Sequence, residues 1–156
     1  MSEDTHGMSK LIDTGAVPGV WYTKPLVSPL RRIQPISFPS AEVHPKAWGS
    51  ERWIINTPLY CAKILTFKAG KSFSDHYHWV KDECWYVVEG KLLLELYNLG
   101  NAERLERIIL PGQVIHVPPG NPHKLTALED SVVYETSTTH DEGDSYRIGK
   151  GASQTQ

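Results

Sequence analysis

The feature that most limits the fold of this chain is a series of short apolar runs between residues 59 and 138. Each run is rich in apolar and β-branched residues, and glycine, proline, asparagine or aspartate closes it. The runs cover residues 59–67, 83–89, 91–99, 104–110, 114–117, 124–128 and 131–138. Many short strands separated by turns are typical of a sandwich, a jelly roll or a barrel. No segment has the pattern of a helix of about ten residues or more, so the sequence predicts an all-β fold.

Residues 1–57 differ from this region because prolines interrupt them repeatedly. The prolines are Pro18, Pro25, Pro29, Pro35, Pro39 and Pro45. Proline has no backbone N–H and a restricted φ angle, so this density argues against long helices and central strands. We expect a proline-rich N-terminal arm over residues 1–44 with a disordered start, a barrel over 45–140 and a polar C-terminal tail over 141–156.

Composition excludes several kinds of partner. The chain has 156 residues and a net charge of -2 without a concentrated basic stripe, so we expect no nucleic-acid partner. No apolar run approaches the roughly 20 residues that span a bilayer, and the acidic, polar N-terminus lacks a secretory pattern. Cys61 and Cys84 are too few for a disulfide framework. These features predict a cytoplasmic protein with free thiols and no membrane partner.

Three histidines and one glutamate form a candidate metal site. His76 and His78 project from the same face of a strand, because side chains alternate with a period of two. Glu83 opens the next apolar run, where a hairpin would return its carboxylate towards the histidines, and His123 follows a Pro-Gly turn. Three nitrogens and one oxygen suit Zn, Fe, Mn, Ni or Cu rather than Mg or Ca.

The spacing of these residues resembles the first motif of the cupin superfamily. That motif has a glycine, five residues, His-x-His, three or four residues, a glutamate, six residues and a glycine. The chain matches it with Gly70, His76, His78, Glu83 and Gly90, with four residues between His78 and Glu83.

A second cupin motif follows after residues 91–111. It has a glycine, five residues, Pro-x-Gly, two residues and a histidine, and it ends on asparagine. The chain matches it with Gly112, Pro118, Gly120 and His123, and departs from it only at Ala127, which replaces the asparagine. That position is not a ligand in the family.

The cupin resemblance implies a double-stranded β-helix, or jelly-roll barrel, over the matching region. It also implies that His76, His78, Glu83 and His123 hold one divalent transition metal, which is Zn, Mn, Fe or Ni. We expect a homodimer, since many small cupins dimerise through sheet edges.

A finer resemblance points to a class of chemistry. The stretch 46–51, with Lys63, Glu135 and Tyr146-Arg147, is similar to type II mannose-6-phosphate isomerases and their small relatives, although Ala47 replaces the usual proline. This resemblance implies isomerase-type chemistry on a sugar phosphate or sugar nucleotide, with a small anionic substrate. Two alternatives stay open: a non-haem iron dioxygenase or metal-dependent lyase on a small organic acid, and a non-catalytic sugar- or metal-binding module.

Two residues are candidates for catalysis. Alternation places Lys63 on the same strand face as Leu65 and Phe67, and this bulky apolar face should line the barrel interior. The isomerase resemblance places Glu135 inside as well. We hypothesise that Lys63 binds the anionic part of the substrate and that Glu135 shuttles a proton. In the alternative arrangement, both side chains lie on the outer surface of the sheet.

Overall fold

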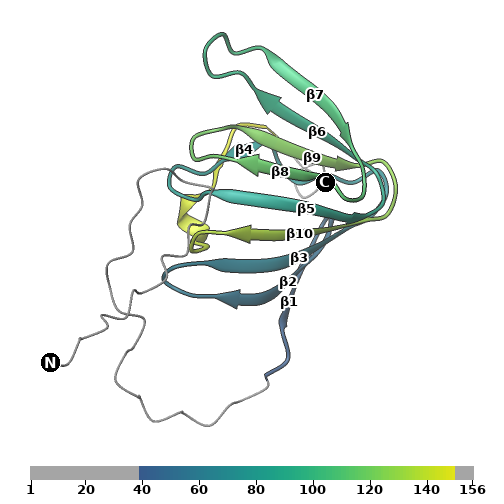
Figure 1. Ribbon diagram of the computed structural model, residues 1–156, viewed down its shortest axis with the longest axis vertical. Helices are drawn as coiled ribbons and strands as arrows, with labels where there is room; N and C mark the ends of the chain where they lie inside the picture. The colour runs from purple at the N-terminus through teal and green to yellow at the C-terminus, as the bar shows by residue number, and fades with distance from the viewer. Residues whose placement is uncertain (1–38, 150–156) are drawn as a thin grey trace, which may run out of the picture. The chain divides into compact units, whose positions relative to one another are not determined.

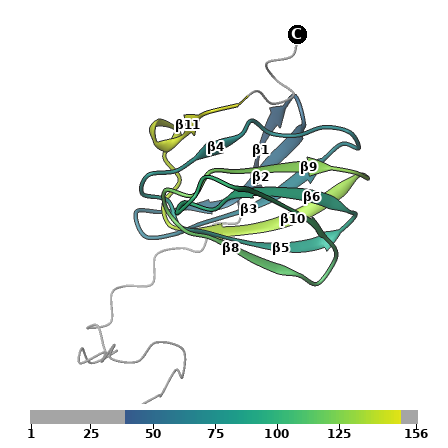
Figure 2. The same ribbon diagram turned by 90° about the horizontal axis from the view of Figure 1, so that it is seen from above.

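Residues 39–149, the part of the chain that the computed structural model describes, form eleven strands in two antiparallel sheets. The two sheets enclose a common interior, with β1, β2 and β3 at one side and β6 and β7 at the other (Figures 1 and 2). This arrangement confirms the predicted all-β jelly-roll fold. No helix within residues 39–149 is long and apolar enough to cross a membrane.

The larger sheet has the strand order β1-β2-β3-β10-β5-β8. Its strands are β1 (Glu42–Lys46), β2 (Gly49–Asn56), β3 (Cys61–Phe67), β5 (Glu83–Glu89), β8 (Val114–Val117) and β10 (Ser131–Ser137). β10 comes last in the sequence but lies between β3 and β5. It therefore places Glu135 opposite Lys63 on one side and opposite Trp85 on the other.

The smaller sheet has the strand order β11-β4-β9-β6-β7. Its strands are β4 (His76–Tyr77), β6 (Leu92–Tyr97), β7 (Arg104–Ile109), β9 (His123–Ala127) and β11 (Tyr146–Arg147). A short 3₁₀ helix, η1 (Glu142–Asp144), precedes β11. The pairing of β4 with β9 puts His76 directly opposite His123.

The core lies between the sheets and is built from side chains at alternate positions along the strands, which face inward. Both sheets contribute to one cluster, which contains Trp48, Leu65, Phe67, Trp85, Val87, Leu92, Leu94, Ile109, Val117, Leu125, Ala127 and Val133. Trp48, in the turn between β1 and β2, stacks on Phe67 with ring centroids 4.5 Å apart. Burial of this much apolar surface is the main stabilising contribution to the fold.

One glycine of the first motif has a clear structural reason. Gly90 has φ +87°, and a Cβ atom there would lie 2.4 Å from the carbonyl oxygen of Asp130. Only glycine fits such a close backbone approach with a positive φ. The turn after β5 therefore depends on this residue, which returns the chain into β6.

All seven apolar runs form strands, with small shifts at their ends. The sequence did not predict the hairpin of β1 and β2. β1 is an edge strand that tolerates Pro45, and most of β2 is exposed or half-buried, so neither shows a regular alternation. β1 also crosses the boundary that we placed at residue 44. The predicted disordered start lies outside the described residues.

Candidate metal centre

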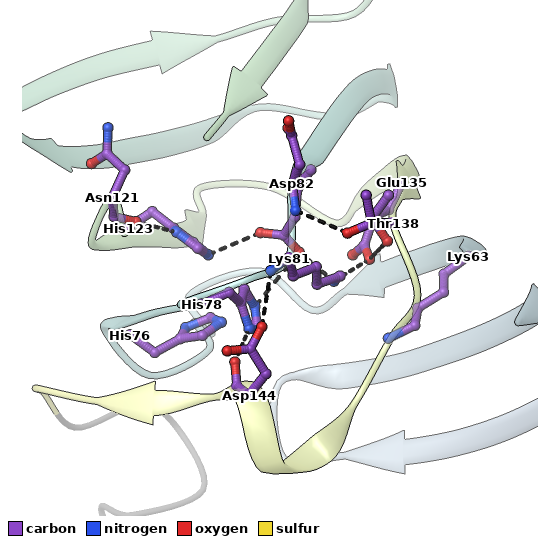
Figure 3. A network of polar contacts seen from close by, with 12 residues as sticks. Lys63, His76, His78, Lys81, Asp82, Asn121, His123, Glu135, Thr138 and Asp144 are labelled. Carbon is purple, nitrogen blue, oxygen red and sulfur yellow. Dashed lines mark hydrogen bonds and ion pairs between the residues drawn. The ribbon is translucent and has the colours of Figure 1, made fainter. Parts of the chain in front are cut away.

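The three histidines come from two paired strands and the loop that follows the first of them. His76 opens β4, His123 opens β9, and His78 lies directly after β4. Each can offer one ligand atom, and these atoms lie within 4.8 Å of one another. Figure 3 shows His76 and His78 on one side of the site and His123 on the other. The structure thus brings together all three predicted histidines.

Backbone carbonyls fix which ring nitrogen each histidine presents. Nδ1–H of His76 donates to the carbonyl oxygen of Ser74 at 2.7 Å, and Nδ1–H of His123 donates to that of Asn121 at 2.9 Å. Nδ1–H of His78 donates to the carbonyl oxygen of Asp144. A carbonyl only accepts, so each Nδ1 carries the proton and each Nε2 keeps a free lone pair. This is the tautomer that a metal-binding histidine needs.

Burial keeps the imidazoles of His76 and His123 neutral. Burial lowers the pKa of His76 to about 3, with a further contribution from His123. Burial also lowers the pKa of His123 to about 4, against the opposing effect of its hydrogen bond to Asn121. Both rings are therefore uncharged at neutral pH, so that protons do not compete with a cation for their Nε2 lone pairs.

Glu83 lies beside these histidines at the start of β5. Its Oε2 is 3.3 Å from Nε2 of His123, and its Oε1 is 3.7 Å from Nε2 of His78. Neither Oε2 of Glu83 nor Nε2 of His123 has a hydrogen-bond partner. Two buried acceptors that face each other are unfavourable unless a cation or a proton lies between them. The residues present therefore fit a divalent metal ion, with Glu83 as the fourth predicted ligand.

A buried lysine, Lys81, connects Glu83 to Glu135, one of the two candidate catalytic residues. Nζ of Lys81 bonds Oε1 of Glu83, and it lies 2.6 Å from Oε1 of Glu135 (Figure 3). Burial lowers the pKa of the Lys81 ammonium, but Glu135 and Glu83 raise it more, so the net pKa lies above the usual range. Lys81 is therefore a permanent cation that neutralises one of two neighbouring carboxylates.

The side chain of Lys63 points into the interior, as alternation predicted, and is 2% exposed. Its Nζ lies 3.3 Å from Oε2 of Glu51 and 4.7 Å from the ring centroid of Trp53. Burial raises the pKa of the Glu51 carboxyl, but Lys63 and a hydrogen bond from Trp53 lower it to a value below the usual range. Glu135 is buried as well, so both candidate catalytic residues face inward rather than towards solvent.

A pocket of about 560 Å³ connects these groups. Its volume is within the range of small-molecule sites. Four cationic and four carboxylate side chains line it: Lys46, Lys63, Lys81 and Arg147, with Glu51, Glu83, Glu135 and Glu142. These charges balance, so that a divalent cation on the histidines would leave the pocket with a net positive charge.

Several site residues escaped the sequence analysis. The sequence did not indicate Lys81, because a charged residue in a loop is usually solvated. It did not indicate Asp144, because the partners of Asp144 lie more than 60 residues away. His140 also lines the pocket; burial, followed by Lys63 and Lys81, lowers its pKa to about 4. Only the position of Lys81 between two predicted ligands could have served as a signal.

Comparisons with known proteins support the fold of this chain. Residues 63–138 match the family described as the cupin domain. No curated protein matches the chain. Among solved structures, oxalate decarboxylase from Bacillus subtilis is similar with a TM-score of 0.61 and 15% identity, over 69% of this chain and 30% of that one.

A second solved structure is similar to the same extent. It is the capsular polysaccharide assembling protein CapF from Staphylococcus aureus, with a TM-score of 0.61 and 23% identity, over 72% of this chain and 33% of that one. The chain thus spans about a third of the length of both structures. At these identities, the likeness concerns the fold.

Proposed function

We propose that this chain, whose residues 63–138 match the cupin domain, binds one divalent transition-metal ion and catalyses proton transfer on a small anionic substrate. The observation that carries the proposal is the convergence of three imidazoles, two of them buried, beside a carboxylate oxygen of Glu83 that has no hydrogen-bond partner. Such a donor set suits Zn, Mn, Fe or Ni. A bound ion would act as a Lewis acid towards a carbonyl or hydroxyl oxygen of the substrate.

The charge of the pocket supports an anionic substrate. Because its cations and carboxylates balance, a divalent ion makes the pocket positive, and a concave site with low-dielectric walls strengthens the attraction of an anion. We assign Lys63 to the anionic group of the substrate. Its ammonium has three N–H donors, and Glu51 accepts from one of them, so two remain for a ligand.

Glu135 is the group that we assign to proton transfer. It is buried, it lines the same pocket as the histidines, and Lys81 holds one of its oxygens. In aldose–ketose isomerisation, one base takes a proton from a carbon next to a carbonyl and returns it to the adjacent carbon. Glu135 can accept and return that proton on its second oxygen. We therefore propose a sugar phosphate or sugar nucleotide as the substrate class.

The test combines metal analysis with turnover. Elemental analysis of the purified protein should give one divalent metal per chain, and a thermal-shift screen should show stabilisation by sugar phosphates. Turnover should persist without oxygen and with a redox-inert metal. Glu135→Gln should abolish turnover but keep metal and ligand binding, since it keeps the shape and removes the base. Glu89→Gln, at the exposed end of β5, is the matched control and should leave turnover intact.

Other outcomes would assign the site to a different class. Oxygen consumption with an absolute need for iron would identify a dioxygenase. Stabilisation by ligand without any turnover would identify a binding module. Full turnover in Glu135→Gln would overturn the role of Glu135 and leave the metal site standing.

A further inference from the structure

The segment 141–149, which we call the C-terminal strap, lies across the backbone that carries two of the histidines. It contains η1 and β11, and β11 pairs with β4 so that Arg147 lies opposite His76. The N–H groups of Ile148 and Gly149 donate to the carbonyl oxygen of Asp75 at 2.9 Å and 3.0 Å. The strap is thus attached to the residue before His76 and to β4.

Asp144 connects the strap to the second histidine in two ways. Its carbonyl oxygen accepts from Nδ1–H of His78. Its carboxylate accepts from the backbone N–H of Trp79 at 2.7 Å, of Val80 at 3.1 Å and of Lys81 at 2.9 Å. Figure 3 shows Asp144 directly beside His78. One residue therefore orients the imidazole and binds the start of the loop that follows it.

The loop 79–82 joins His78 to Glu83, two predicted ligands, and its first two residues have little packing of their own. The side chains of Trp79 and Val80 are 69% and 71% exposed, so apolar burial does not hold this part of the loop. The hydrogen bonds to the Asp144 carboxylate hold the start of this loop. Its second half has further partners, because Lys81 pairs with Glu83 and Glu135 and the N–H of Asp82 donates to Thr138. Since residue 78 and residue 83 are at its two ends, the bonds to Asp144 contribute to the placement of His78 relative to Glu83.

We propose that Asp144 is a positioning residue for the metal centre and that the C-terminal strap and the metal ion stabilise each other. This inference rests on the proposed metal site. Preorganised ligands bind a metal more tightly, and loss of a group that orients them typically lowers affinity by about 10–100-fold. The coupling is reciprocal by thermodynamic linkage, so metal binding must also make the strap more stable.

The first experiment measures zinc affinity of the full chain by competition with a chelator. Asp144→Asn should bind zinc about 10–100-fold more weakly than the wild type, because one acceptor oxygen becomes an NH₂ group that faces the loop N–H groups. Asp130→Asn is the matched control. Asp130 also accepts from a loop N–H, that of Ala69 at 2.7 Å, but it lies beyond the opposite end of β9 from His123. This control should lose stability without losing zinc affinity.

The second experiment needs no variant and is independent of whether Asp144→Asn folds. Zinc should slow amide hydrogen exchange at Trp79, Lys81 and Ile148 in the wild-type protein, relative to amides of β7. Equal zinc affinity in the wild type and Asp144→Asn, or unchanged exchange in the strap on zinc binding, overturns this inference alone. A wild-type protein that binds no zinc, manganese, iron or nickel overturns the proposed metal site as well.

Discussion

Two layers of side chains inside the barrel differ in character although the same four strands supply both. The polar layer consists of Lys63, Glu83, His123 and Glu135. The apolar layer consists of the residues two positions away on the same strands and the same faces: Leu65, Trp85, Leu125 and Val133. Every member of both layers is buried. Alternation thus decides which side chains face inward, whereas position along the strand separates the polar layer from the apolar one.

The two layers also depend on their neighbours differently. Apolar side chains gain stability from burial against any well-packed surface. Buried charges need particular partners, because an unpaired charge in the interior costs several kcal/mol. In the polar layer, Lys81 pairs with both Glu83 and Glu135, and Glu51 pairs with Lys63.

The largest expected effect is on metal binding in the polar layer. His123→Ala and His78→Ala should each lose the bound metal completely, since each removes one of three converging imidazoles. Leu125→Ala, two residues further along β9, should keep the metal at full stoichiometry. Elemental analysis of the three purified variants gives the answer. Full metal content in both histidine variants would refute the assignment of the site.

In the apolar layer, we expect a substitution to lower the stability of the fold rather than the metal content. Leu125→Ala should lower the free energy of unfolding by about 2–5 kcal/mol, because it removes buried methyl groups and leaves a cavity. His123→Ala should cost less in the metal-free protein, since it removes an Nε2 that lacks a partner there. Urea unfolding of both metal-free variants measures the difference. If His123→Ala lowered the free energy of unfolding more than Leu125→Ala, the polar layer would contribute more to stability than the apolar layer, against this prediction.

A smaller effect is expected when Lys81, which pairs with two carboxylates of the polar layer, is replaced by a neutral residue. Lys81→Met leaves Glu83 and Glu135 as buried carboxylates without their cation, which should cost about 3 kcal/mol in the metal-free protein. Saturating zinc should recover part of this loss, because the ion supplies positive charge beside Glu83. Unfolding curves of wild type and variant, with and without zinc, test both statements. A loss that zinc leaves unchanged would separate Lys81 from the metal centre.

The smallest effect that we predict concerns acid. The pKa of His123 is about 4 in the folded protein and that of a histidine in the unfolded chain is about 6.5. Unfolded protein therefore binds protons first as the pH falls, and stability that is complete above pH 6.5 is lost below it. Between pH 7 and 5 this loss is about 2 kcal/mol for His123 in the metal-free protein. It should be absent in His123→Ala and present in Leu125→Ala.

Much of the fold and of the metal centre could be predicted from local patterns. The apolar runs and their turn residues indicated seven of the nine strands that follow residue 59, and the motif spacing indicated His76, His78, Glu83 and His123. The β1–β2 hairpin was not resolved, because its exposed faces leave no alternation to recognise. The homodimer, the arm and the catalytic roles of Lys63 and Glu135 stay predictions.

The sequence by itself determined which residues alternate inward and which residue types stand at the turns, because periodicity and turn chemistry act over a few neighbouring residues. Only the tertiary structure decided which charges meet. Lys81 pairs with Glu135 across 54 residues, and His78 is oriented by Asp144 across 66. The position of β10 between β3 and β5 and the pairing of β11 with β4 create these contacts. Local rules do not extend to such pairs, because their partners become neighbours only when the two sheets close.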